Sequence, residues 1–191
     1  MQELYRALFD KVPDFSGISL PTANGVSPLR TIFVAQEIVK WTDGKPLEGT
    51  LMALLRLCSS DVSMRDATYG LRLDEVLVRN ERSPEGGSYI FSVHDVREAR
   101  DDAGNFLNTW LKPNQSRGQT FLERVLHEAS YYLERSEHLD ERTWTLCSSS
   151  CHNDGSLISV RWVQDKLGYS PVEAKFSLKM PKYLRPRRVY L

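Results

Sequence analysis

The spacing of hydrophobic positions predicts a helical region followed by a mostly strand-forming one. In the first sixty residues, apolar side chains recur three to four positions apart, which is typical of amphipathic helices. This spacing predicts helices over residues 4–12, 28–41 and 47–58. The second has a favourable start, because Ser27 is a suitable N-cap and Pro28 suits the first helical position.

From about residue 70, apolar and polar residues alternate, as expected for strands with one buried and one solvent-facing side. One helical stripe, over residues 119–136, interrupts this alternation. The expected strands are 71–78, 89–94 and 106–111 before that helix and 143–148, 156–164 and 172–180 after it. The order predicts an α+β fold: N-terminal helices, then antiparallel strands in two three-stranded blocks around one central amphipathic helix.

The length of 191 residues suits one domain. We expect residues 1–180 to form it, with a helical part over 1–60 and a sheet part over 70–180. A basic, extended C-terminal arm, residues 181–191, follows, because its two prolines disfavour a helix or an inner strand.

The composition is that of an ordinary soluble protein, with 41% hydrophobic and 26% charged residues. No apolar run approaches the roughly 18 residues that a membrane helix needs. The first ten residues include acidic side chains at helical spacing, unlike a signal peptide. Three cysteines, an odd number, favour reduced thiols. These features together predict a cytoplasmic protein without membrane contact.

Charge is distributed unevenly although the whole chain is neutral. Residues 156–191 hold eight Lys or Arg against two acidic residues, a net charge of +6, so residues 1–155 carry −6. Guanidinium groups bind carboxylates and phosphates, and tyrosine rings can stack on bases. The sequence therefore predicts a surface that docks an acidic protein partner or a nucleic-acid backbone. The predicted binding residues are Lys175, Lys179, Lys182, Tyr183, Arg185, Arg187, Arg188 and Tyr190.

Two other arrangements of the basic arm are open at this point. The arm could lie on the protein's own acidic surface, for instance on the central helix with Glu123 and Glu128. The opposite charges of the two parts of the chain would also suit head-to-tail contacts in a homo-oligomer.

Asp154, Glu173 and Lys175 form a pattern of an acid followed about twenty residues later by Glu-x-Lys. The pattern resembles the metal-binding signature of the PD-(D/E)xK nuclease family. The resemblance implies that the two carboxylates hold Mg²⁺ and that the lysine steadies the nucleophilic water or the phosphate. Strand alternation places Glu173 and Lys175 on the same face, as that chemistry requires. A Mg²⁺-dependent nuclease is therefore the alternative function.

Other candidate chemistry is incomplete. Cys147, Cys151 and His152 have a spacing seen in zinc sites, but tetrahedral zinc needs four ligands and a second pair is missing. Phosphate-loop, dinucleotide-binding and serine-hydrolase motifs are absent from the sequence. His94 and Asp95 fit a cross-strand polar pair. We therefore expect no metal and no cofactor, and interpret the chain as a non-catalytic binding or adaptor subunit of a larger assembly.

Overall fold

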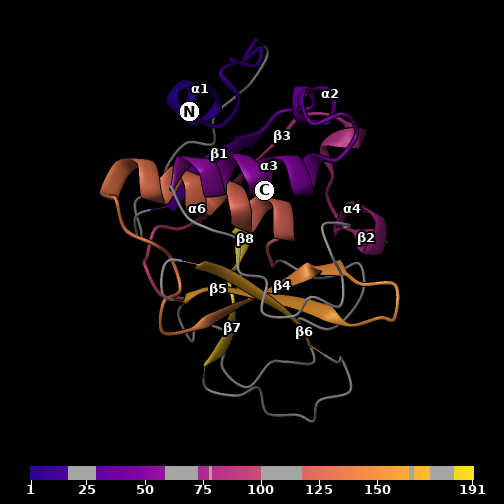
Figure 1. Ribbon diagram of the computed structural model, residues 1–191, viewed down its shortest axis with the longest axis vertical. Helices are drawn as coiled ribbons and strands as arrows, with labels where there is room; N and C mark the ends of the chain where they lie inside the picture. The colour runs from indigo at the N-terminus through magenta and orange to yellow at the C-terminus, as the bar shows by residue number, and fades with distance from the viewer. Residues whose placement is uncertain (17–28, 59–72, 78, 100–117, 164–165, 173–182) are drawn as a thin grey trace.

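Helices and two sheets make up the fold, which confirms the predicted α+β class (Figure 1). The computed structural model describes residues 1–16, 29–58, 73–77, 79–99, 118–163, 166–172 and 183–191. Its elements in chain order are α1 (Gln2–Phe9), β1 (Leu29–Val34), α2 (Glu37–Trp41), α3 (Pro46–Leu57), α4 (Leu73–Val76), β2 (Arg79–Asn80), the 3₁₀ turn η1 (Pro84–Gly86), β3 (Tyr89–His94), α6 (Phe121–Arg135), β4 (Trp144–Cys151), β5 (Leu157–Val163), β6 (Lys166–Val172), β7 (Leu184–Pro186) and β8 (Val189–Tyr190).

The two sheets recruit strands that lie far apart in the chain. The first has the order β1-β3-β8, and the second has the order β2-β4-β5-β6, with β7 pairing in parallel beside β4. All other pairs are antiparallel. In Figure 1, α3 and α6 lie side by side above the second sheet. Because α6 contacts both β1 and β4, it joins the two sheets in one core.

The predicted central helix is confirmed as α6. The Thr120 hydroxyl accepts a hydrogen bond from the Glu123 N–H, and the Glu123 carboxylate accepts one from the Thr120 N–H, which makes a capping box. Ser136, in the left-handed conformation with φ 52°, ends the helix. The Arg82 guanidinium donates to both carboxylate oxygens of Glu123 at 2.6 and 2.9 Å. The start of α6 is therefore held by a local motif and by a side chain from a distant segment.

The helix predicted over residues 28–41 is wrong in its first half. Residues 29–34 form β1, and only Glu37–Trp41 is helical. Ile32, Phe33 and Val34 are all buried, so the second half of this strand is covered on both sides. A strand covered on both sides has a continuous apolar run, which hydrophobic spacing alone does not distinguish from a helix.

The strand predicted over residues 71–78 is also wrong where it is described, because Leu73–Val76 form a helical turn. The Asp74 carboxylate accepts hydrogen bonds from the backbone N–H groups of Leu47 and Glu48 at 3.0 and 2.8 Å. These two groups lie in the first turn of α3 and have no partner within that helix. A contact outside the segment, which the local pattern does not reveal, therefore stabilises this helical turn.

The predicted strands at 89–94, 143–148 and 156–164 are confirmed as β3, β4 and β5. The strand expected over 106–111 lies outside the described residues, as does all but the first residue of the one expected over 172–180. The strand that pairs with β5 is instead β6, whose seven residues align in full register from Lys166 to Val172.

Candidate binding surface at the C-terminal segment

The C-terminal segment, residues 183–191, takes part in both sheets. Its first strand, β7, lies parallel to β4, where Trp144 is aligned with Leu184. Its second strand, β8, pairs with β3, where Ser92 is aligned with Tyr190. Between the two strands, Arg188 forms a single antiparallel bridge with Gly118. Backbone pairing thus holds this segment against the domain.

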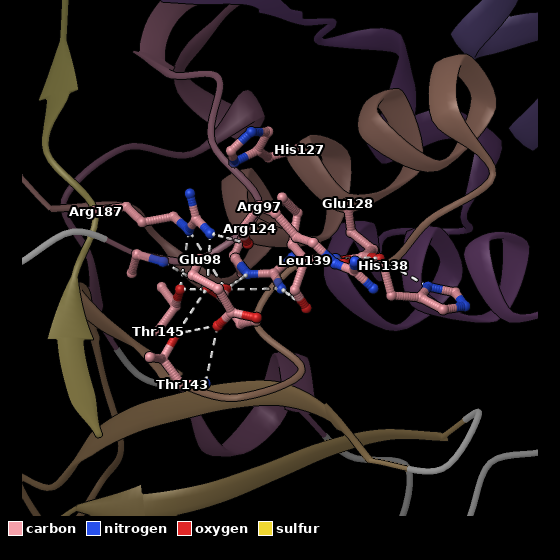
Figure 2. Close-up of polar contacts among 12 residues, drawn as sticks. Arg97, Glu98, Arg124, His127, Glu128, His138, Leu139, Thr143, Thr145 and Arg187 are labelled. Atoms are coloured by element: carbon pink, nitrogen blue, oxygen red, sulfur yellow. Dashed lines mark hydrogen bonds and ion pairs between the residues drawn. The ribbon is translucent and has the colours of Figure 1, made fainter. Parts of the chain in front are cut away.

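Arg187 anchors the segment from inside. Its side chain is buried, with 3% of the residue exposed, and its guanidinium donates to the Asp140 carboxylate at 2.6 Å. The same group donates to the backbone oxygens of Val96 and Arg97 at 2.9 and 2.8 Å and to the Thr145 hydroxyl at 3.1 Å. Figure 2 shows these contacts converging below α6. Arg187, one of the predicted binding residues, therefore stabilises the fold and is not accessible to a partner.

Asp140 is the common acceptor in this network. Its fully buried carboxylate also accepts hydrogen bonds from Arg124 at 3.0 Å, from the Thr145 hydroxyl and from the Ala99 N–H at 3.1 Å. Burial by itself raises the pKa of a carboxyl group. Here Arg187 and Arg124, with the hydrogen bonds, outweigh burial and lower the pKa of Asp140. The carboxylate is therefore charged at neutral pH.

The network continues through Arg124 to the end of α6. Arg124 donates to Glu128 at 2.7 Å, and Glu128 is bonded in turn to His138 at 2.9 Å. On the opposite side, Glu98 accepts hydrogen bonds from the N–H and hydroxyl of Thr143. Burying charges costs free energy unless each is paired and hydrogen-bonded. This satisfied set is therefore a structural anchor that connects α6, β4 and the C-terminal segment.

His127 lies on α6 and points away from these contacts (Figure 2). Its Nδ1 is 3.3 Å from the Gln119 side-chain nitrogen, and its Nε2 has no hydrogen-bond partner among the described residues. Burial, reinforced by the positive charges of Arg187, Arg124 and Arg30, places the pKa of His127 well below the usual value. The imidazole is therefore neutral in the folded protein at neutral pH.

Outward-facing side chains alternate with buried ones over residues 187–190 of the segment. Leu184, Pro186 and Val189 are buried. By contrast, Arg188 is exposed and Tyr183 and Tyr190 are 57% and 39% exposed. Successive side chains of an extended chain point to opposite sides, so the buried Arg187 and Val189 direct Arg188 and Tyr190 outward. The partly buried Arg185 donates to the Ala99 backbone oxygen at 3.4 Å.

Tyr190 is held in place by a residue of the neighbouring strand. Its hydroxyl is hydrogen-bonded to His94 Nε2 at 3.1 Å, and the two rings meet edge to face with centroids 5.6 Å apart. His94 is aligned with Leu29 of β1, which is 43% exposed. On the same side of the sheet, the Thr31 hydroxyl is 2.9 Å from that of Ser92.

We define the β8 face as the exposed or half-buried side chains on this side of the first sheet: Leu29, Thr31, His94, Arg188 and Tyr190. Sequence reasoning identified Arg188 and Tyr190 but missed the other three, which come from β1 and β3. The alternating pattern of β3 was the available signal, because it places His94 on the side opposite to the buried Val93.

Asp154 is the described member of the predicted nuclease set, because Glu173 and Lys175 lie outside the described residues. Asp154 occupies a turn, where its carboxylate accepts a hydrogen bond from the Ser156 N–H at 2.8 Å and pairs with His152 at 3.1 Å. The hydrogen bonds from Ser156 lower the pKa of Asp154. The nuclease remains a prediction from the sequence. Lys175, Lys179 and Lys182 of the binding set likewise lie outside the described part of the chain.

The cysteines with zinc-site spacing lie within the described ranges of the chain. Cys147 and Cys151 are buried, and burial raises the pKa of the Cys147 thiol. Within these ranges no group of three or more His, Cys, Asp or Glu side chains is placed to hold a metal ion.

None of the helices in the described ranges is long and apolar enough to cross a membrane.

Comparison of the chain with protein-family models, with curated proteins and with solved structures finds no match. The geometry of the described residues is therefore what supports a function.

Proposed function

We propose that this protein is a non-catalytic binding subunit that docks an acidic surface of a partner protein through the exposed side of its C-terminal segment. One observation carries the proposal: Arg187 fixes the segment from inside while Arg188 and Tyr190 face outward. A segment whose backbone is held in place before binding loses little conformational freedom when a partner binds. Anchoring therefore suits a recognition surface.

A protein partner fits the exposed side chains better than a nucleic-acid backbone does. Arginine and tyrosine are enriched among the residues that dominate protein–protein binding. Binding to nucleic acid depends instead on neutralising several phosphates at once. Within the described segment, Arg187 is buried and Arg185 is hydrogen-bonded to a backbone oxygen. Arg188 is the remaining arginine of this segment. One available guanidinium favours a protein partner that offers few charges and some apolar surface.

The test starts from capture of partners by the immobilised full-length chain and by two variants. The first variant combines Arg188→Glu with Tyr190→Ser. The matched control, Arg56→Glu, reverses an exposed charge on α3. A captured protein counts only after it has been purified and its affinity measured directly at low and physiological salt. We expect it to bind the wild type and the control equally and the double variant at least about tenfold more weakly. Equal binding of all three proteins overturns the proposal.

Nucleic acid is examined in parallel by fluorescence anisotropy with labelled single- and double-stranded DNA and RNA. We expect no salt-sensitive binding that depends on Arg188. Tight binding that falls steeply with salt and is lost in the Arg188→Glu/Tyr190→Ser variant would contradict the choice of a protein partner.

A further inference from the structure

The β8 face carries a positive charge that the described residues do not compensate. Arg188 is exposed, and it forms no ion pair with any described residue. The nearest carboxylate in sequence to His94 is Asp95, which turns to the other side of the sheet and pairs with Arg30 at 2.8 Å and with Arg135 at 2.7 Å. No carboxylate is among the five residues of the β8 face. The complementary group on a partner is therefore an anion.

A hydroxyl group lies beside this charge and is fixed in position. Arg188 and Tyr190 are two residues apart on an extended chain, so they lie on the same side with Cα atoms about 6–7 Å apart. The Tyr190 hydroxyl is held by His94 Nε2, whose Nδ1 is buried without a hydrogen-bond partner among the described residues. A guanidinium fork and a phenol at this spacing can both contact the oxygens of one carboxylate.

Apolar surface adjoins these polar groups. Leu29 is 43% exposed and is aligned with His94 across the β1–β3 pair. The other end of this sheet face is covered, because Phe33 packs against Phe15 with ring centroids 5.2 Å apart. The open apolar area is thus confined to the end of the face that carries Arg188.

We infer that the β8 face binds a carboxylate side chain of the partner together with an adjoining apolar side chain. Arg188 and the Tyr190 hydroxyl hold the carboxylate, His94 positions Tyr190, and Leu29 contacts the apolar group. The inference rests on the proposed function, since it names the chemical group that the docking surface recognises. It adds His94 and Leu29, which the C-terminal segment alone does not contain.

The probe is a labelled peptide of alternating glutamate and leucine residues, titrated into the ¹⁵N-labelled full-length protein. Two matched peptides serve as controls, one with glutamine in place of glutamate and one with serine in place of leucine. We expect amide shifts concentrated at Leu29, His94, Arg188 and Tyr190 with the first peptide. Affinity should be at least about tenfold weaker for either control.

Variants assign the roles. Arg188→Gln should weaken binding of the glutamate–leucine peptide about tenfold, and Tyr190→Phe, which keeps the ring, about fivefold. His94→Gln should weaken binding in the wild type but have no further effect in the Tyr190→Phe background, because a positioning residue acts through the hydroxyl that this variant lacks. Arg56→Gln is the control for loss of one exposed positive charge.

The outcomes separate this inference from the function on which it rests. If the purified natural partner requires Arg188 and Tyr190 but binds His94→Gln and Leu29→Ser variants as well as wild type, the inference is overturned and the proposed function stands. The inference is also overturned if the peptide shifts resonances elsewhere or binds Arg188→Gln unchanged. If the natural partner binds the Arg188→Glu/Tyr190→Ser variant normally, both fail.

Discussion

Arg187 and Asp140 are 47 positions apart in the chain and form a buried ion pair, with the guanidinium nitrogen 2.6 Å from the carboxylate oxygen. This contact ties the C-terminal segment to the loop between α6 and β4. Because Asp140 also binds Arg124 of α6, one carboxylate holds together a helix, a sheet and the end of the described chain. The direction in which Arg188 and Tyr190 point depends on it.

Loss of the Arg187 side chain should strongly destabilise the fold. We expect Arg187→Met to lower the free energy of unfolding by about 3–5 kcal/mol, because Asp140 then keeps a buried charge with one partner fewer. Urea unfolding followed by circular dichroism measures this. Arg188→Met, at the adjacent exposed position, should change stability by less than about 0.5 kcal/mol. If Arg187→Met and Arg188→Met lowered the free energy of unfolding equally, the ion pair between Arg187 and Asp140 would not anchor the segment.

Stability should fall below neutral pH because of His127. Its pKa is far below the usual value in the folded state, whereas the unfolded chain takes up a proton near pH 6.5. The unfolded state therefore binds more protons as pH falls below 6.5, and stability is lost at up to about 1.4 kcal/mol per pH unit.

Urea unfolding of the wild type and of His127→Gln between pH 7 and pH 5 tests this assignment. The variant should lose most of the pH dependence in this range, because glutamine does not titrate. A slope that is unchanged in the variant assigns the pH dependence to other groups.

Asp140 should affect stability at much lower pH. Its pKa is lowered in the folded state, so its contribution is present above the unfolded value of about 3.9 and is lost as pH falls through the folded value. Asp140→Asn should be less stable than wild type at pH 7, and the difference should shrink on acidification below about pH 4. A stability difference between wild type and Asp140→Asn that stays constant down to pH 2 would contradict a lowered pKa of Asp140 in the folded protein.

The cap of α6 should contribute measurably to stability. Thr120→Ala removes the hydroxyl that accepts the Glu123 N–H and should cost about 1–2 kcal/mol. Thr120→Ser keeps the hydroxyl and is the matched control, with most of the stability retained. Thermal unfolding at one pH compares the three proteins, and a Ser variant as unstable as the Ala variant would assign the loss to the missing methyl group instead.

The cysteines should react slowly in the folded protein. Cys147 and Cys151 are buried, and burial, with a smaller contribution from Glu128, raises the pKa of Cys58 to about 12. The thiolate is the reactive form, so a disulfide reagent at pH 7.5 should label the native chain much more slowly than the urea-unfolded chain. Rapid labelling of a native cysteine would contradict the burial of that residue.

Local pattern was sufficient where an element is determined by its own residues. The apolar stripe of α6, the apolar face of α3 and the alternation of β3 and β5 could all be predicted, because each follows a regular period of apolar residues in the sequence. The uneven charge of the chain was likewise apparent from the sequence, and it pointed to the C-terminal segment, where Arg188 and Tyr190 are exposed.

The tertiary structure decided the features that depend on contacts between distant residues. Residues of β1 were predicted as a helix because the second half of the strand is buried on both sides and has a continuous apolar run. Residues of α4 were predicted as a strand from local alternation, whereas in the structure they form a helical turn whose Asp74 binds the start of α3. Nothing in the run Arg185, Arg187 and Arg188 indicates which guanidinium is buried. That choice depends on where Asp140 lies after folding, since only a paired and hydrogen-bonded charge can be buried at acceptable free-energy cost.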